Sequence, residues 1–338
     1  MNKKIKFLLP LSLSVIAISA SCSRASVTPV EPIQSQAPVA PLPSIAPDPN
    51  TQQPSTGKSF DLKILSFNCW GVPRILVYDP TKDQRERFTN ILSVVNGYDI
   101  VNLQETFSDN SDIIINGANY PTKVRYNNTS FGSFGSGLTS FSKYQVVKKG
   151  FKKFSECSGT DCFSNKGVFF MRLNVPQLGQ VDLYNTHYQA QTGESEEQIR
   201  VASNKEFADF VKQNEVGNLT IITGDFNFIN YDATDKTSRA YTDFVKRFNP
   251  VDTFRIKNPQ SPGFTNDSKI NTYASKEDKP QRLDYIFTLP ENRGVASKAV
   301  NYKVEVVDSK IMFTQPVNGK FLSDHFGLTT TLRINLTN

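Results

Sequence analysis

The segment Phe321-Leu322-Ser323-Asp324-His325-Phe326-Gly327-Leu328 contains one of only two histidines in the 338-residue chain. His325 follows a carboxylate and precedes an apolar stretch, residues 326–336, that predicts the last strand of the protein. Because imidazole is the side chain best suited to exchange protons near neutral pH, this chain has few places for such chemistry. A lone histidine in a turn more often packs or forms a structural hydrogen bond, so the importance of His325 depends on its neighbours in the fold.

Apolar and amphipathic stretches alternate along residues 60–338, which predicts one large α/β domain. Phe88, Ile91, Leu92 and Val95 have the i, i+3, i+4, i+7 spacing of a helix, expected over residues 81–96. Two further helices are expected over residues 194–212 and 241–248. The expected strands cover residues 62–67, 100–103, 138–141, 168–173, 181–184, 219–223, 283–289, 302–307 and 326–336.

Polar side chains gather at the ends of these expected strands. They are Asn68, Glu105, His187, Asp225, Asn227, Asp324 and His325, and they include both histidines. Buried strands hold their ends rigidly, so several strands can direct polar groups to one point. Any one such residue is more often a turn former or a cap, but the whole set favours a shared functional site.

The residue types in this set suit metal-assisted hydrolysis. The oxygen donors are Asn68, Glu105, Asp225, Asn227 and Asp324. A small number of hard oxygen ligands favours Mg²⁺, with Mn²⁺ as a substitute, and leaves the two histidines for proton transfer. No activated Ser or Cys nucleophile is evident, so the pattern indicates attack by water on a phosphoester.

The same motifs identify the chain as similar to a known superfamily. In chain order they are Phe67-Asn68, Leu103-Gln104-Glu105, Thr186-His187, Gly224-Asp225-Phe226-Asn227 and Ser323-Asp324-His325. Together they resemble the signature elements of the endonuclease/exonuclease/phosphatase superfamily, across nearly all of residues 60–330. The resemblance implies an α/β, deoxyribonuclease-like fold: a four-layer α/β sandwich of two packed mixed β-sheets flanked by helices.

Four segments resemble the neutral sphingomyelinases within that superfamily. They are residues 68–73, 161–168, 185–190 and 323–327. This resemblance implies a Mg²⁺-dependent phosphodiesterase of the phospholipase C type, which hydrolyses sphingomyelin to ceramide and phosphocholine. The expected partner is membrane phospholipid at the bilayer surface, and the enzyme is expected to be a monomer.

The resemblance also implies a role for each residue of the site. Glu105 would bind the catalytic Mg²⁺ with Asn68 beside it. His325 would be the general base that activates water, and Asp324 would orient it. His187 would act on the leaving oxygen, although the acid and base roles of the two histidines remain open.

The remaining residues have supporting roles in the same scheme. Asp225 and Asn227 would hold the phosphate and the water. Lys166 would partner either the phosphate or Asp161, and its alternative is a solvated lysine in a turn. Asp284 matches a further superfamily acid, with a structural residue at a strand start as its alternative.

Two other functions are compatible with these motifs. One is a nuclease or phosphoinositide phosphatase of the same superfamily, and the other is a non-catalytic relative that binds membranes. The formal net charge is +6, but without Lys3, Lys4 and Lys6 of the leader only 35 basic residues face 32 acidic ones. A balance of +3 is low for a nucleic-acid binder, so no nucleic-acid partner is expected.

The first 58 residues have the composition of an exported leader. Residues 1–22 combine three lysines with an uncharged apolar run, as signal peptides do, and Cys22 follows small residues as in a lipoprotein cleavage site. Residues 23–58 are rich in Pro, Ser and Gln and predict a disordered linker. The catalytic domain is therefore expected over 59–338, in a protein secreted or anchored as a lipoprotein on the outer surface of a bacterium.

Two further features have alternative interpretations. Cys157 and Cys162 could close a short loop as a disulfide in an oxidising compartment, while Cys69 reads as a buried free thiol. Residues 311–313, Ile-Met-Phe, could form an apolar hairpin tip that inserts into the membrane interface or a buried edge strand.

Overall fold

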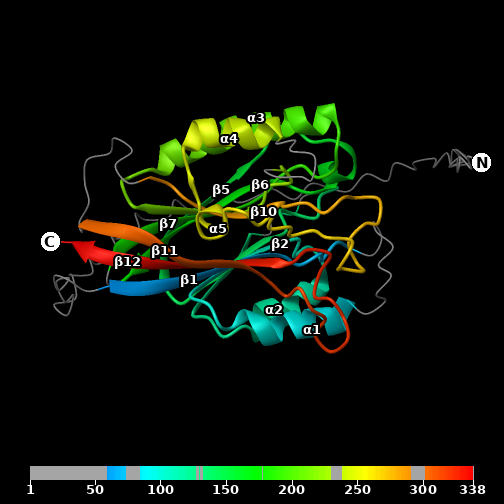
Figure 1. The fold of residues 1–338 in the computed structure, drawn as a ribbon, viewed down its shortest axis with the longest axis horizontal. Helices are drawn as coiled ribbons and strands as arrows, with labels where there is room; N and C mark the ends of the chain where they lie inside the picture. The colour runs from blue at the N-terminus through cyan, green and yellow to red at the C-terminus, as the bar shows by residue number, and fades with distance from the viewer. Residues whose placement is uncertain are drawn as a thin grey trace, which may run out of the picture. The chain divides into compact units, whose positions relative to one another are not determined.

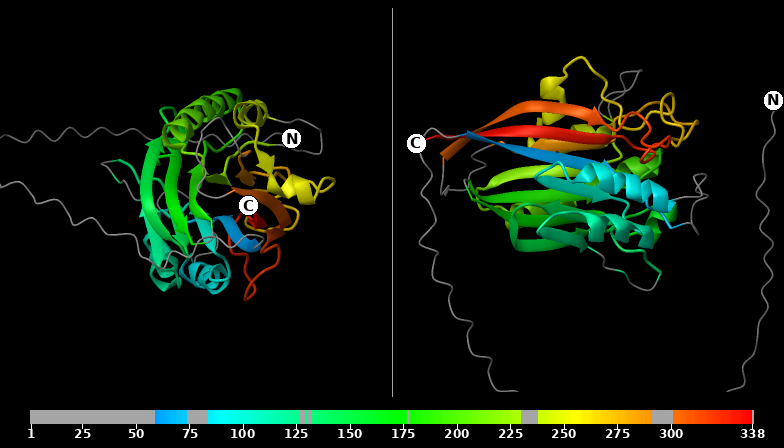
Figure 2. Two further views of the ribbon diagram at one scale, coloured as in Figure 1. Left: turned by 90° about the vertical axis from the view of Figure 1, so that its left-hand side faces the viewer. Right: turned by 90° about the horizontal axis from the view of Figure 1, so that it is seen from below.

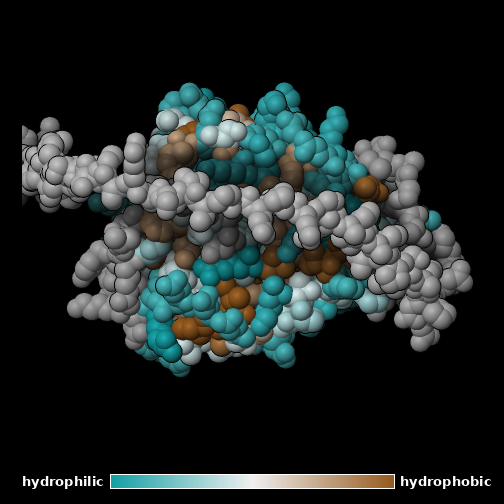
Figure 3. Space-filling view, turned by 180° about the vertical axis from the view of Figure 1, so that it is seen from behind, coloured by the Kyte–Doolittle hydropathy of each residue, from teal (hydrophilic) through white to brown (hydrophobic). Residues whose placement is uncertain are grey.

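The computed structural model describes residues 59–73, 84–126, 129, 132–176, 178–229, 238–290 and 301–337. The predicted signal peptide and linker, residues 1–58, lie outside this part of the chain. No helix among the described residues has both the length and the apolar character needed to cross a membrane. On the face shown in Figure 3, hydrophilic residues predominate and hydrophobic ones form smaller, separate groups.

Two six-stranded sheets form the centre of the domain. The first has the order β11-β12-β1-β2-β4-β3 and the second the order β5-β6-β7-β8-β10-β9. The strands of the first sheet are β1 (Ser59–Asn68), β2 (Ile100–Gln104), β3 (Thr122–Tyr126), β4 (Leu138–Ser142), β11 (Asn301–Met312) and β12 (Gly327–Thr337). Those of the second are β5 (Gln145–Lys153), β6 (Gly167–Val175), β7 (Gly179–His187), β8 (Leu219–Asp225), β9 (Val251–Asp252) and β10 (Asp284–Thr288).

Helices cover the outer faces of both sheets. Helices α3 (Glu194–Asn214) and α4 (Arg239–Phe248) lie on the second sheet, and α1 (Gln84–Val95) and α2 (Asp112–Gly117) lie on the first (Figures 1 and 2). A short helix, α5 (Thr253–Lys257), connects β9 to the segment that follows it, and 3₁₀ turns occur at Asp109–Ser111 and Gly159–Phe163. The predicted four-layer α/β sandwich, two mixed sheets flanked by helices, is confirmed.

The alternation of side chains along the strands explains why the layers stack. In β1, Leu62 and Ile64 belong to the core cluster that contains residues of both sheets, while Leu65 and Phe67 pack with residues of α1. Successive residues of a strand point to opposite faces, so a strand with apolar residues on both faces suits a sheet covered on both sides. Burial of each such Leu, Ile or Phe side chain contributes about 1.5–3 kcal/mol relative to exposure.

The strand register brings the polar strand ends to one edge of the sandwich. β1 and β2 are parallel, with Asn68 beside Gln104, and β7 and β8 are parallel, with His187 beside Asp225. β10 is antiparallel to β8 and begins where β8 ends, so that Asp284 pairs with Asp225. β12 begins just after His325 and runs antiparallel to β1, which places the 321–327 segment at the same edge.

Residues 311–313 form the edge-strand alternative of the sequence analysis. Ile311 and Met312 pair with Leu328 and Gly327 in the β11–β12 ladder. The ring of Phe313 packs on that of Phe67, with 5.3 Å between their centroids. The structure thus supports the edge-strand alternative for Ile311 and Met312. All three side chains are half-buried, so insertion of this segment into a membrane interface stays a prediction.

Candidate active site

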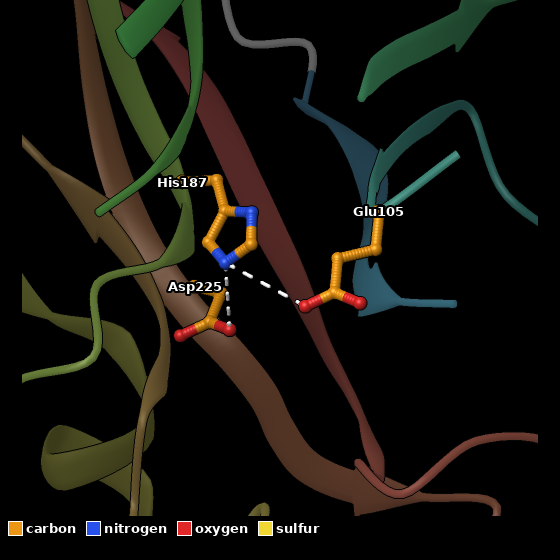
Figure 4. A group of neighbouring side chains, drawn as sticks. All are labelled: Glu105, His187 and Asp225. Atoms are coloured by element: carbon orange, nitrogen blue, oxygen red, sulfur yellow. Dashed lines mark ion pairs between the residues drawn. The ribbon is translucent and has the colours of Figure 1, made fainter. Parts of the chain in front are cut away.

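Residues from five strand ends and two loops meet at this edge. Asn68 ends β1, Glu105 follows β2, His187 ends β7, Asp225 ends β8 and Asp284 begins β10, while Asn227 and the Asp324-His325 pair lie in adjacent loops. Figure 4 shows Glu105 extending from its own segment toward His187 and Asp225. The structure thus brings together the residues that the sequence analysis singled out.

The group drawn in Figure 4 is held by short polar contacts. His187 Nε2 lies 3.5 Å from Asp225 Oδ2 and 3.8 Å from Glu105 Oε1. The Asn68 amide nitrogen donates to Glu105 Oε1 at 3.1 Å and to Asp225 Oδ2 at 2.9 Å. The Asn68 oxygen accepts from the Trp70 backbone N–H at 2.9 Å. In this orientation the Asn68 amide nitrogen holds the two carboxylates, and the amide would have to rotate by half a turn to offer its oxygen to a cation.

Glu105 has an unusual backbone and an unusual pKa. Its φ of +55° lies in the left-handed region, and Gly71 fits against it because a Cβ at Gly71 would lie 2.3 Å from the Glu105 carbonyl oxygen. Burial raises the pKa of the Glu105 carboxyl to about 7, with a further contribution from the charge of Asp324. Its Oε2 atom is buried without a hydrogen-bond partner among the described residues.

Asp225 and Asp284 form a second acidic group around His325. His325 Nδ1 lies 2.8 Å from Asp284 Oδ2, and Nε2 lies 3.9 Å from Asp225 Oδ2. Burial raises the pKa of Asp225 to about 6, and the Asp284 charge adds to the effect. Burial lowers the pKa of His325, but Asp284, Asp225 and Asp324 outweigh it and hold that pKa well above the usual 6.5.

Asp324 does not have the role that the sequence analysis predicted for it. Its carboxylate accepts from the Ser323 hydroxyl at 3.1 Å, whereas the hydrogen bond to the His325 ring is made by Asp284. The His325 ring is thus oriented by a residue of β10 rather than by its own chain neighbour. Asp324 still lines the same pocket as His325.

Lys166 lies on the other side of the centre, against His187. Its Nζ is 2.8 Å from His187 Nε2, 3.2 Å from Asp161 Oδ2, and donates to the Tyr188 carbonyl at 2.8 Å. Burial lowers the pKa of His187 well below 6.5, and the positive charges of Lys166 and His325 add to this effect. Lys166 is 6% exposed, which argues against a solvated lysine in a turn.

Asn227 completes the loop after β8. Its φ is +50°, its backbone N–H donates to Asp225 Oδ1 at 3.0 Å, and its amide nitrogen donates to the Tyr188 carbonyl at 3.2 Å. These contacts fix the Asp225 carboxylate and the Asn227 side chain, and both residues line the same pocket as His325.

The donor set fits a divalent cation. Two groups each place ligand atoms within 4.8 Å of one another: Glu105, His187 and Asp225, and Asp225, Asp284 and His325. At this site Glu105 Oε2 and Asp284 Oδ1 are buried without a hydrogen-bond partner among the described residues, and such oxygens are costly unless they meet a cation or water. Carboxylate oxygens are the ligands that Mg²⁺ and Mn²⁺ prefer.

Two pockets of different character open at Glu105. The first contains His325, Asp225 and Asp324 and is lined mainly by polar side chains, so we call it the polar pocket. The second contains Lys166 and His187 at its polar end, and we call it the apolar pocket. Its apolar lining consists of Val72, Pro73, Phe107, Phe134, Phe163 and Ala190.

Sequence reasoning missed residues that position the site from a distance. The buried guanidinium of Arg87, on α1, donates to the carbonyls of Cys69, Trp70 and Leu322 at 2.5, 2.6 and 2.8 Å. It therefore ties the segment after Asn68 to the segment before His325. The absence of Arg87 from the predicted site is understandable, since a helical arginine carries no motif, but an arginine on the apolar side of an amphipathic helix is a usable signal.

The cysteines behave as expected. Cys157 and Cys162 form a disulfide with 5.2 Å between their Cα atoms, and Cys69 is a buried free thiol within the described part of the chain. Burial raises the pKa of the Cys69 thiol, so it stays protonated and serves as a core residue.

A model of the "Endonuclease/Exonuclease/phosphatase family" matches residues 65–325 of the chain. The chain is 28% identical over 295 residues to a putative neutral sphingomyelinase of Drosophila melanogaster, which covers 81% of this chain and 61% of that protein. It is 26% identical over 316 residues to an inositol phosphosphingolipids phospholipase C of Schizosaccharomyces pombe, covering 83% of this chain and 70% of that protein. The chain thus spans less than two thirds of the Drosophila relative.

Solved structures share the fold at lower identity. Beta toxin from Staphylococcus aureus, a mutant with bound magnesium ions, matches 80% of this chain and 99% of its own with a TM-score of 0.61 and 22% identity. D. rerio TDP2 complexed with single strand DNA product matches 80% of this chain and 98% of its own, with a TM-score of 0.61 and 16% identity. At these identities the likeness shows the fold alone.

Proposed function

Because the chain belongs to the endonuclease/exonuclease/phosphatase family, we propose that it is a divalent-cation-dependent phosphodiesterase of the phospholipase C type. Its substrate is sphingomyelin, which it hydrolyses to ceramide and phosphocholine. The observation that carries the proposal is the meeting of Glu105, Asp225 and both histidines of the chain at one edge of the sandwich. The relatives in fly and fission yeast support the choice of a sphingolipid as substrate.

The residues around His325 suit activation of water. Asp284 accepts a hydrogen bond from the Nδ1–H of His325 and so fixes the ring. Nε2 then remains to accept a proton in the polar pocket. In the proposed reaction His325 takes a proton from water as the new oxygen–phosphorus bond forms. Tautomer and orientation are both set by one buried carboxylate, so Asp284 is a positioning residue for His325.

The residues around His187 suit the leaving oxygen. The bond between phosphorus and the ceramide oxygen breaks, and that oxygen receives a proton on the side where His187 and Lys166 lie 2.8 Å apart. Lys166 supplies the positive charge there, and Asp161 holds its ammonium group in place. His325 takes up one proton from water and the alcohol receives one on the His187 side, so the site returns to its starting state once His325 has released its proton to solvent and the His187 side has regained one.

Glu105 and Asp225 would hold the cation, with His187 Nε2 in the same group of donor atoms. A bound Mg²⁺ or Mn²⁺ supplies neutralisation of phosphate charge and stabilises the charge that develops during in-line displacement. Asn68 and Asn227 keep the two carboxylates in place through the hydrogen bonds described above.

A panel of substrates tests the proposal. The purified protein is given sphingomyelin vesicles, phosphatidylcholine vesicles, phosphoinositides and plasmid DNA, each with Mg²⁺ or with EDTA. We expect Mg²⁺-dependent release of phosphocholine from sphingomyelin. Nicking of DNA or release of inorganic phosphate without lipid turnover would assign the site to the nuclease or phosphatase alternative, and cation binding without any turnover would assign it to a non-catalytic membrane binder.

The proposal extends to the place of action. Residues 1–22 have the composition of a signal peptide, which supports export, and Cys22 is the candidate for lipid attachment. Expression in a bacterial host with labelled palmitate tests the anchor. Label that enters the wild-type protein and is lost in Cys22→Ala supports a lipoprotein, and a wild-type protein without label supports simple secretion.

A further inference from the structure

The apolar pocket has more exposed aromatic surface than a site for phosphate alone requires. Phe107 and Phe134 are half-buried, and Phe163 is 46% exposed, although all three line one cavity that also contains Glu105, Lys166 and His187. Aromatic side chains are normally buried, so a cavity lined by three of them next to a reactive centre indicates an apolar ligand.

Backbone contacts hold the walls of this pocket in place. The Phe134 N–H donates to the Phe163 carbonyl at 2.8 Å, and the disulfide between Cys157 and Cys162 closes the loop that ends at Phe163. Gly137, at a φ of +65°, admits the Phe107 ring, because a Cβ there would lie 2.5 Å from it. The pocket is therefore a formed part of the fold rather than a gap between loops.

The charges in the apolar pocket argue against a cationic ligand. Asp161 is already paired with Lys166 at 3.2 Å and also accepts from the Ala190 N–H at 2.6 Å. Glu105 is assigned to the cation in the proposed function. A trimethylammonium group would thus meet the Lys166 ammonium without a carboxylate of its own, although its attraction to aromatic rings is well known.

The polar pocket differs from the apolar pocket in its negative charge, which suits the cationic end of a phosphocholine group. It is lined by the carboxylates of Asp278 and Asp324 in addition to Glu105 and Asp225, whereas Glu197, which also lines it, is paired with Arg200 at 2.9 Å. A positively charged headgroup is favoured beside such carboxylates and an uncharged alkyl group is not.

Resting on the proposed function, we infer that the apolar pocket binds the uncharged, apolar end of the substrate, the ceramide portion, while the phosphocholine end lies in the polar pocket. Glu105 lines both pockets, so a phosphodiester that reaches Glu105 extends into each of them. The ceramide oxygen then lies at the end of the apolar pocket, beside His187 and Lys166. Phe107, Phe134 and Phe163 become specificity-determining residues for the leaving group.

Phe163→Ala is the variant that tests this assignment. Because Phe163 is 46% exposed, its truncation removes pocket surface with little loss of core packing. Ile256→Ala is the matched control, since Ile256 is 61% exposed and lines neither pocket. Both variants are compared with wild type on short-chain sphingomyelin, kept monomeric below its critical micelle concentration, and on glycerophosphocholine, tested as substrate and as competitor.

We expect Phe163→Ala to lower kcat/KM for the monomeric sphingomyelin about tenfold, mainly through KM, as loss of an apolar contact does. Phe163→Leu should restore most of the lost kcat/KM. Turnover and competition by glycerophosphocholine should change less than twofold in Phe163→Ala. Ile256→Ala should match wild type throughout. Equal loss for both ligands, or a loss seen only with vesicles, would overturn the assignment. If the wild-type protein releases phosphocholine from none of these substrates, the proposed function itself is refuted.

Discussion

The two pockets share Glu105 but differ in the histidine that each one contains. In the polar pocket, His325 is surrounded by Asp284, Asp225 and Asp324, and its pKa is held above the usual value. In the apolar pocket, His187 lies against Lys166, and its pKa is well below the usual value. The neighbours of the two histidines thus give them opposite proton affinities, which favour a protonated His325 and a neutral His187 when no cation is bound. For His325 to act as the base, a bound cation has to offset the negative charges of Asp225 and Asp324.

Glu105→Gln should have the largest effect, because Glu105 belongs to both pockets. Activity should fall by about 10³-fold or more, as for loss of a principal metal ligand or charge stabiliser. Isothermal titration should show weakened Mg²⁺ binding, while circular dichroism should match wild type. Asp109→Asn, a change of an exposed acid outside both pockets, is the matched control and should bind and turn over normally.

The polar pocket can be disabled through a residue that does not face the substrate. Asp284→Asn should reduce kcat by about 10²–10⁴-fold, since it removes the group that fixes the His325 ring. His325→Ala should cost at least as much. The double variant should be no worse than His325→Ala, and additive losses would mean that Asp284 acts independently of His325.

The apolar side should respond more weakly. Lys166→Met should reduce kcat about 10–100-fold because positive charge beside the leaving oxygen is lost, and the pKa of His187 should rise. NMR titration can follow the pKa of His187, since only two histidine signals have to be assigned. An unchanged His187 titration together with full activity would show that the Lys166–His187 contact has no part in the reaction.

The pH dependence of stability should reflect the shared carboxylates. The pKa of Glu105 is raised from 4.5 to about 7, so the folded protein binds protons more tightly than the unfolded chain. In EDTA, this contribution to stability is present below pH 4.5 and is lost as pH rises through about 7. The thermal midpoint of wild type should therefore fall relative to Glu105→Gln across this interval, and Mg²⁺ should reduce the difference. A constant difference in Tm would contradict the raised pKa.

The smallest effect should come from the disulfide beside the apolar pocket. The Cys157→Ser/Cys162→Ser variant loses the constraint on the loop that carries Asp161 and Phe163. We expect about a threefold rise in KM for short-chain sphingomyelin and little change for glycerophosphocholine, with a stability loss of about 2 kcal/mol. A change in kcat for both ligands would place the effect at the catalytic centre instead.

Much of the site was predictable because it lies on regular elements. Period-two and continuous apolar runs located β1, β2, β7 and β8, and the polar residues at their ends follow directly. The partner of His325 was not predictable in this way. The contact with Asp284 depends on the antiparallel register between β10 and β8, which no local pattern encodes, and the adjacent Asp324 was the wrong choice.

The apolar pocket was missed for a related reason. Phe107 and Phe134 lie in two different loops and Phe163 ends a short 3₁₀ turn, and single aromatic residues in such segments have no periodicity to mark them. The backbone contacts that bring them together, such as the one between Phe134 and Phe163, are long-range. The same limit applies to Arg87, whose three carbonyl partners lie in distant segments.

Hydrolysis of sphingomyelin in ¹⁸O-labelled water tests the central claim most directly, since it reports which bond breaks and where the water goes. With Mg²⁺, mass spectrometry should find one ¹⁸O atom in phosphocholine and none in ceramide, and EDTA or Glu105→Gln should remove both products. Label in ceramide, or phosphocholine that forms equally well in EDTA, would contradict cation-assisted attack of water on phosphorus.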